Sequence, residues 1–211
     1  MRAAARLAAL VLALGTAATP AGAATLVRDL GQGLTYFRVH DLPGDQPSPP
    51  SGRPGACVID LRFAKSDDAS AATFRAWVTF NLSAHTPVFI LENTQTDAAL
   101  LAALPGGAHP GLFVLAPISA RISPDIAVHV TEDADKKAYD ALEKGADVGS
   151  LLSDYPDKPR IDEAYLEKEH IADSDAPDEP TDKPAPPVPL TDPMLQRAVQ
   201  LHRGLLALRR I

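Results

Sequence analysis

The sequence predicts an α/β fold built on a mostly parallel sheet, and two observations support this. Short apolar runs alternate with amphipathic stretches of similar length between Leu34 and Ile118, which is the pattern of successive βα units. The run "ACVIDLRF" (56–63) is also almost unbroken in its apolar character. Strands of this kind are typical of parallel sheets that are covered on both faces.

The first expected strand, Leu34 to Val39, ends at a Pro- and Gly-rich loop that leads into the run 56–63. Pro47, Pro49, Pro50 and Pro54 in that loop prevent a helix or a central strand. Residues 70–83 form an expected amphipathic helix, because four apolar residues recur there at helical spacing. These residues are Phe74, Trp77, Val78 and Leu82.

The second half of the chain continues the alternation. Expected strands are "TPVFILEN" (86–93), "GLFVLAPI" (111–118) and the short "DIAVHV" (125–130), with the helix "DAALLAAL" (97–104) between the first two. The sequence of residues 133–152 predicts two helices that are separated by a break at Gly145. The chain closes with a helix over 191–210, in which Thr191 or Asp192 can cap and Pro193 fits the first turn.

Residues 1–23 have the layout of a secretory signal peptide, with Arg2 and Arg6, an apolar run and a final "AGA". The apolar run is too short to span a bilayer. We therefore expect an exported chain, periplasmic or extracellular, without membrane insertion after cleavage. Its domains are expected to be an α/β domain over 24–171, an acidic Pro-rich linker over 172–190 and a docked helix over 191–211.

Charge and cysteine content narrow the classes of function. The net charge is -7, and it becomes -9 once Arg2 and Arg6 are removed. Nucleic acids and anionic membranes need clustered Lys and Arg, so neither is expected as a partner. Cys57 is the only cysteine. It cannot form an intramolecular disulfide, and its apolar surroundings favour a buried, inert thiol.

Five stretches occur in an order that is known from one enzyme family. They read "GLTYFRVHDL", "VIDLR", "TPVFILENTQTDAALLAAL", "ISPDIAVHV" and "TDPMLQRAVQLHRGLLAL". In this order they resemble the C-terminal processing (tail-specific) serine proteases, which are secreted peptidases. The resemblance implies the ClpP/crotonase-like fold, with repeated ββα and βα units and a C-terminal helix.

The resemblance breaks at the catalytic positions. The family begins the helix after its "PV" strand with a motif close to Thr-Ala-Ser-Ala, and the matching residues here are Thr96, Asp97, Ala98 and Ala99. Ala98 stands at the nucleophile position, and a methyl group cannot attack. The family's general base is a Lys about 25 residues further on, but the matching stretch "APISARISPDI" has only Arg121, which stays protonated.

Two further parts of the family's machinery are missing. Its Gly-rich turn after "DLR" lets backbone amides approach the oxyanion, whereas "FAKSDDAS" has no glycine and brings the charges of Asp67 and Asp68. The PDZ domain that selects peptides has no room in this chain. The resemblance therefore implies a catalytically inactive homologue that acts as a peptide- or protein-binding or scaffold module.

An active hydrolase with a relocated catalytic set stays open as the alternative. It would draw on Ser66, Ser70 or Ser119 together with His40, His109 or His129. Thr94 and Thr96 are better explained as helix caps, and Asp97 as a charge that complements the helix dipole.

Cofactors and metals are not expected. The six histidines include no HExxH motif and no pair at i, i+4. The acidic string from Asp173 to Asp182 lacks the Gly and the terminal Glu of an EF-hand loop, and prolines interrupt it. The expected partner is an extended peptide or another exported protein.

Overall fold

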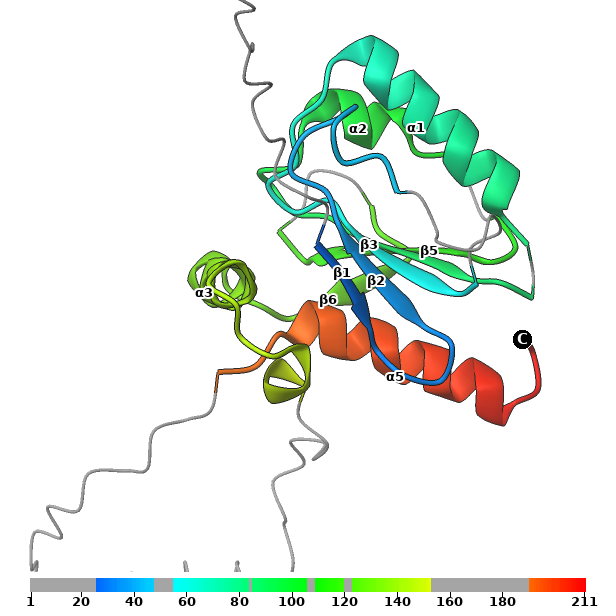
Figure 1. The fold of residues 1–211 in the computed structure, drawn as a ribbon, viewed down its shortest axis with the longest axis vertical. Coiled ribbons are helices and arrows are strands. Elements are labelled where there is room, and N and C mark those ends of the chain that lie inside the picture. Colours follow the sequence, from blue (N-terminus) through cyan, green and yellow to red (C-terminus); the bar gives the residue numbers. More distant parts are fainter. Residues whose placement is uncertain (1–25, 48–54, 84, 106–108, 120–122, 153–189) are drawn as a thin grey trace, which may run out of the picture.

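The computed structural model describes residues 26–47, 55–83, 85–105, 109–119, 123–152 and 190–211 (Figure 1). The expected signal peptide, most of the acidic linker and the acidic string from Asp173 to Asp182 lie outside these residues. Within the described ranges, no helix is long and apolar enough to cross a membrane.

A six-stranded sheet forms the centre of the molecule, with its strands in the order of the chain. β1 pairs with β2 in antiparallel fashion, and all later pairs are parallel. The prediction of an α/β fold with a mostly parallel sheet is therefore confirmed. The strands are β1 (Leu26–Asp29), β2 (Thr35–Arg38), β3 (Cys57–Asp60), β4 (Val88–Leu91), β5 (Leu112–Pro117) and β6 (Ile126–Val128).

Helices cover both faces of the sheet (Figure 1). α1 (Asp68–Asn81) and α2 (Ala98–Ala103) lie over one face, and α5 (Pro193–Ala207) crosses the other. α3 (Glu132–Glu143) and the 3₁₀ helix η1 (Val148–Leu151) contribute apolar side chains to the same core as α5. Each face thus has its own apolar core, which explains why the strands read as continuous apolar runs.

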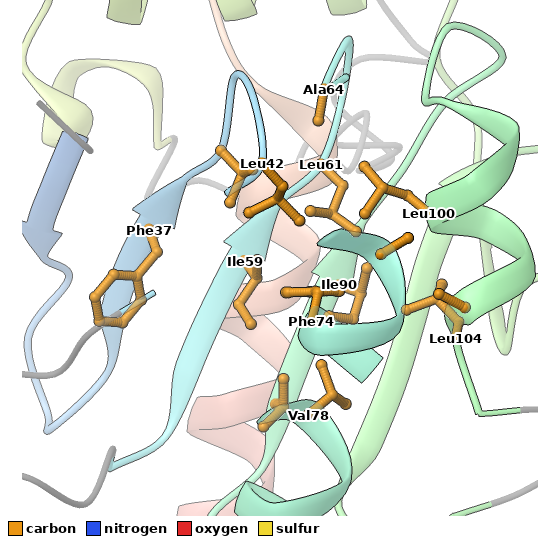
Figure 2. Close-up of a cluster of buried hydrophobic side chains, with 14 of the residues drawn as sticks. Phe37, Leu42, Ile59, Leu61, Ala64, Phe74, Val78, Ile90, Leu100 and Leu104 are labelled. Carbon is orange, nitrogen blue, oxygen red and sulfur yellow. The ribbon is translucent and has the colours of Figure 1, made fainter. Parts of the chain in front are cut away.

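β4 shows how the two cores are filled. Its alternate side chains Val88 and Ile90 belong to the α1/α2 core, whereas Phe89 and Leu91 belong to the α5 core, as the twofold period of a strand requires. Figure 2 shows the α1/α2 core, where Phe74 of α1 packs against the sheet. The expected burial of Cys57 is confirmed, and this burial raises the pKa of its thiol to about 12.

Short polar side chains begin the helices. The carboxylates of Asp67, Asp97 and Asp192 accept hydrogen bonds from the first-turn amides of α1, α2 and α5, and Thr131 does the same for α3. Asp192 is thus the cap of the last helix, and Pro193 lies in its first turn as predicted. The backbone N–H of Asp192 also donates to the carbonyl of Leu151 at 2.9 Å, which joins η1 to the start of α5.

Two local expectations need correction, and a third is confirmed. Capping of α2 by Thr94 or Thr96 is wrong, because Asp97 is the cap and the Thr96 hydroxyl instead bonds to Asn93 N–H and Leu61 carbonyl. The second member of the predicted helix pair is only the four-residue η1. The break at Gly145 is confirmed, since Gly145 has a φ of +88° and its N–H closes α3 on Leu142.

β1 is an element that sequence patterns did not predict. Its sequence, LVRD, is short and largely exposed, so it lacks the apolar run by which the other strands are recognised. Its pairing with β2, from Leu26 opposite Arg38 to Asp29 opposite Thr35, fixes it at one end of the sheet.

Candidate functional site

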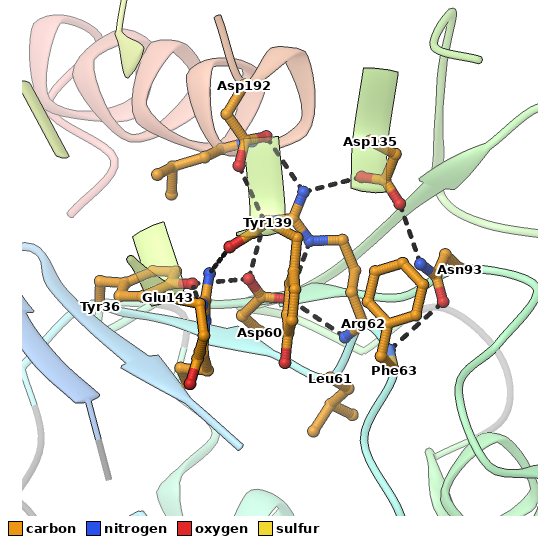
Figure 3. Close-up of polar contacts among 12 residues, drawn as sticks. Tyr36, Asp60, Leu61, Arg62, Phe63, Asn93, Asp135, Tyr139, Glu143 and Asp192 are labelled. Carbon is orange, nitrogen blue, oxygen red and sulfur yellow. Dashed lines mark hydrogen bonds and ion pairs between the residues drawn. The ribbon is translucent and has the colours of Figure 1, made fainter. Parts of the chain in front are cut away.

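Buried charges gather where β3 ends (Figure 3). The guanidinium of Arg62 donates to Asp60 at 2.7 and 2.9 Å, to Asp135 of α3 at 2.8 Å, and to Asp192 at 2.8 and 3.2 Å. We call these four residues the Arg62 cluster. Arg62, Asp60 and Asp192 are fully buried and Asp135 is 2% exposed, so the cluster ties β3, α3 and the cap of α5 together away from water.

A second arginine extends this network along β2. Arg38 donates to the Tyr36 hydroxyl at 3.1 Å and to Glu143 at 2.8 Å, and its guanidinium lies 3.9 Å from the centre of the Tyr139 ring. Tyr36 in turn donates to Asp60 at 2.6 Å. The network therefore runs from β2 through β3 to both helices α3 and α5.

The charges in the network stabilise one another. Burial disfavours the charged form of Asp60, but Arg62 and Arg38 hold the pKa of that carboxyl below its usual range. Burial also disfavours the charged guanidinium of Arg62, yet Asp192 and Asp60 raise its pKa well above the ordinary value. Burial, followed by the charge of Asp60, raises the pKa of Tyr36. These groups keep fixed protonation states at neutral pH, which suits a structural role and not proton transfer.

A pocket of about 330 Å³ opens beside the network. It lies past the carboxyl ends of β3, β4 and β5, where open parallel sheets commonly bind ligands. The pocket is lined by Phe63, Asn93, Gln95, Ser119, Glu132 and Lys136, among others. The side chain of Asn93 in this lining is already engaged, because its amide nitrogen donates to Asp135 at 2.9 Å and its oxygen accepts from the N–H of Gln95 at 3.0 Å.

Three consecutive amides in the turn after β3, those of Phe63, Ala64 and Lys65, are not free to bind an oxyanion. Phe63 has a φ of +63°, a conformation that glycine usually occupies, although the turn contains no glycine. The N–H of Phe63 points to the side-chain oxygen of Asn93 at 3.4 Å. The N–H of Ala64 donates to the backbone carbonyl of Leu61, and the N–H of Lys65 donates to the backbone carbonyl of His40. An oxyanion site needs unengaged donors, and these three consecutive N–H groups all have acceptors within the chain.

The residues at the expected nucleophile position form an ordinary helix start. Ala98 is exposed and is the first residue of α2. Asp97 accepts from the N–H of Ala99 at 2.9 Å, so its carboxylate occupies the end of the helix where an anionic intermediate would bind. Asp67, expected to oppose an oxyanion, instead caps α1 through the N–H of Ser70 at 2.7 Å.

Ser119 and His129, two of the residues considered for a relocated catalytic set, line one hollow, but no hydrogen bond joins them among the described residues. Among the described residues, no hydroxyl group is hydrogen-bonded to His40 or His129. His40 bridges the carboxylates of Asp45 and Glu143 at 3.1 and 3.0 Å. Ser66 donates to a neighbouring carbonyl. Of the three candidate serines, only Ser119 lines the pocket.

Glu92 is a buried carboxyl that sequence patterns did not single out. It directly follows β4, has no exposed surface, and neither carboxyl oxygen has a hydrogen-bond partner among the described residues. Burial, with a smaller contribution from the charge of Asp125, raises its pKa to about 8. At neutral pH this carboxyl is therefore mostly protonated.

The edge strand β6 carries unpaired backbone groups. It is the last strand of the sheet, and the Val128 carbonyl accepts from the N–H of Ile118, the residue after β5, at 3.3 Å. Alternate residues of a parallel strand point their N–H and C=O to opposite sides. Ala127, which is exposed, therefore directs both groups away from β5 toward the open side of the sheet.

Hollows lie on both sides of this edge. One, of about 560 Å³, is lined by Ile118, Ser119, Val128, His129, Val130 and Thr131. The other, of about 340 Å³, lies between β6 and α5 and includes His129, Gln196, Arg197 and Gln200. The first shares Ser119 with the pocket beside the Arg62 cluster, so the open edge and the pocket adjoin.

Within the described ranges, no group of three or more His, Cys, Asp or Glu side chains is arranged to hold a metal ion. Comparison of the chain with protein-family models, with curated proteins and with solved structures found no match.

Proposed function

We propose that the chain is an exported, non-catalytic relative of the C-terminal processing proteases, with a ClpP/crotonase-like core, that binds extended segments of other polypeptides. The succession of parallel βα units along the sheet supports the relationship. The engaged amides of Phe63, Ala64 and Lys65, together with the methyl group of Ala98, support the loss of catalysis.

The open edge of β6 is the observation that carries the binding function. An extended peptide that pairs with a sheet edge gains main-chain hydrogen bonds, and pockets beside the edge select its alternate side chains. β6 offers the N–H and C=O of Ala127 and has a hollow on each side. Its residues Ile126, Ala127 and Val128 carry no charge, unlike the exposed Arg28 and Asp29 on β1 at the opposite end of the sheet. Charges on an edge strand discourage pairing with another strand, so β6 is the edge suited to it.

Ala127→Pro should abolish peptide binding without unfolding the chain. Proline removes the outward N–H and its ring obstructs the edge, but an edge strand tolerates it where the N–H faces away from the sheet. Binding of fluorescent peptides with a high β propensity should weaken at least about tenfold, which corresponds to about 1.4 kcal/mol. Ala127→Ser keeps the N–H and is the matched control. Equal binding by both variants would refute the use of this edge.

A fluorophosphonate probe should leave the mass of the purified mature protein unchanged, and an unstructured polypeptide should remain uncleaved after incubation. The reason is that no activated serine is expected in the described part of the chain. A covalent adduct mapped to Ser66, Ser70 or Ser119 would instead support the relocated hydrolase.

A further inference from the structure

The hollow between β6 and α5 is basic, although the chain as a whole is acidic. Residues 193–211 contain four arginines and no Asp or Glu, whereas the full chain has a net charge of -7. Arg197 lines the hollow, is exposed, and has no ion-pair partner among the described residues. Gln200 lies one turn further along α5 and lines the same hollow. We call this space the Arg197 hollow.

A second, apolar hollow of about 210 Å³ continues along α5. It shares Arg197 and Gln200 with the Arg197 hollow and is otherwise lined by Phe113, Leu201, Gly204 and Leu208, among others. We call it the Leu208 hollow. Leu208 is 72% exposed. An additional methyl group at Gly204 would meet no atom within 4 Å, so the absent side chain of this residue leaves the space open.

The two hollows together form a groove with a cation at one end and an apolar surface at the other. Arg197 and Leu205, which also lines the Leu208 hollow, are eight residues apart on α5, or about 12 Å at 1.5 Å per residue. An extended peptide covers that distance in about four residues at 3.3 Å each. Side chains four positions apart on a strand point to the same face, so one peptide can fill both hollows.

We propose that the polypeptides bound at β6 carry an acidic side chain that occupies the Arg197 hollow, with an apolar side chain about four residues away in the Leu208 hollow. This inference rests on the proposed binding function. It names the ligand class as acidic and extended, because a carboxylate complements the guanidinium of Arg197, which forms no ion pair with another described residue, and accepts hydrogen bonds from it.

Asp125 does not contradict this charge preference. Its carboxylate accepts from the backbone N–H of Val114 at 2.9 Å, and Asp125 lines neither of the two hollows. Glu132 and Asp133 line the pocket at the carboxyl ends of the strands, not the α5 groove. The acidic groups near β6 therefore lie outside both hollows that take the peptide side chains.

The test uses three fluorescent peptides of nine residues, built mainly from Thr and Val. They differ at one position, which is Glu, Gln or Lys, and each has a Leu four residues after that position. On the full mature chain at low salt, the Glu peptide should bind about three- to tenfold more tightly than the Lys peptide. Arg197→Glu should reverse this order. Arg75→Glu, an equal charge change on the exposed surface of α1, should leave it unchanged.

A second variant tests the apolar end of the groove. Gly204→Leu should fold normally, since Gly204 is exposed, an added Cβ meets no atom within 4 Å, and leucine favours a helix more than glycine does. It should remove the advantage of the peptide that contains Leu over the same peptide with Ser at that position. Retention of this advantage would show that the Leu208 hollow does not take the peptide.

The outcomes separate the two proposals. Suppose that Ala127→Pro abolishes binding, but the Glu, Gln and Lys peptides bind the wild type equally well. The acidic preference would then be overturned, and the proposed function would stand. Absence of binding by all peptides would overturn both. Analytical ultracentrifugation gives a further check. A stable dimer that Arg197→Glu dissociates would also overturn the inference, because a second copy of the chain would then fill the groove.

Discussion

Replacing Arg62 with methionine is expected to lower the free energy of unfolding by about 3–5 kcal/mol at pH 7. Methionine cannot compensate the charges of Asp60, Asp135 and Asp192, all of which lie almost completely out of water. A buried charge without a partner is costly because it has lost its hydration. Urea unfolding followed by circular dichroism measures the change.

The loss should depend on pH in a defined direction. In the wild-type chain the pKa of Asp60 is lowered, so its contribution to stability is present above the unfolded-state pKa of about 4 and disappears as the pH falls. In the variant, Asp60 stays buried but loses the guanidinium of Arg62, so its charged form is less stable and the variant gains less stability as the pH rises. The difference between the two proteins should therefore be largest at neutral pH and should shrink toward pH 4.

Two further variants serve as controls for the effect of Arg62→Met. Lys136→Met removes the exposed ion pair with Asp140 and should cost less than about 1 kcal/mol. Arg62→Lys keeps the charge but loses the planar fork that reaches three carboxylates, so it should fall between the wild type and Arg62→Met. If Arg62→Met costs no more than Lys136→Met, the Arg62 cluster does not hold α3 and α5 on the sheet.

The parallel sheet and most helices could be predicted because each depends on local patterns. The run from Cys57 to Asp60 reads as a covered strand whatever lies beside it, and Gly145 ends α3 through its own backbone conformation. The start of α5 was also predicted from Thr191, Asp192 and Pro193, although the sequence left the choice of cap between Thr191 and Asp192 open. Each of these signals lies within a few residues of the element that it defines.

The candidate site could not be predicted in the same way, because its contacts join distant parts of the chain. Arg62 meets Asp135 and Asp192 across 73 and 130 positions. No period or spacing connects these residues, and charged residues in a short stretch such as "DLR" usually lie at the surface. The one available signal was the presence of two charges, Asp60 and Arg62, directly at the end of an apolar strand.

The open edge of β6 was unpredictable for a related reason. The residues Ile126, Ala127 and Val128 indicate a strand, but only the order of strands in the sheet makes it the last one. The unpaired state of Glu92 likewise depends on what surrounds it after folding. Sequence patterns identify elements, whereas edges and unsatisfied groups are properties of their assembly.

Glu92→Gln is expected to stabilise the protein at pH 7 and to leave its stability nearly unchanged near pH 4. The pKa of Glu92 is about 8 in the folded chain, against an ordinary value of 4.5. The folded state therefore holds a proton that the unfolded state releases, and wild-type stability falls as the pH rises from about 4.5 to about 8. At pH 7 the penalty is about 3 kcal/mol, from 1.36 kcal/mol per pH unit.

Measured unfolding free energies between pH 4 and pH 9 test this prediction directly. The wild-type curve should decline across the window and level off above pH 8, whereas Glu92→Gln should lack that decline. Glu132→Gln, the same chemical change at an exposed position, should follow the wild-type curve. Parallel curves for the wild type and Glu92→Gln would mean that Glu92 is solvated or paired.

Glu92→Met separates the charge of this residue from its unsatisfied polar atoms. Methionine has a similar shape and no group that requires a hydrogen bond, so it should stabilise the chain even at pH 4, where Glu92 is already neutral. Glutamine retains polar atoms without partners and should not. A gain in stability for Glu92→Met alone at low pH would measure the cost of the hydrogen-bonding groups that lack partners. A gain for both variants at high pH would measure the cost of ionising Glu92.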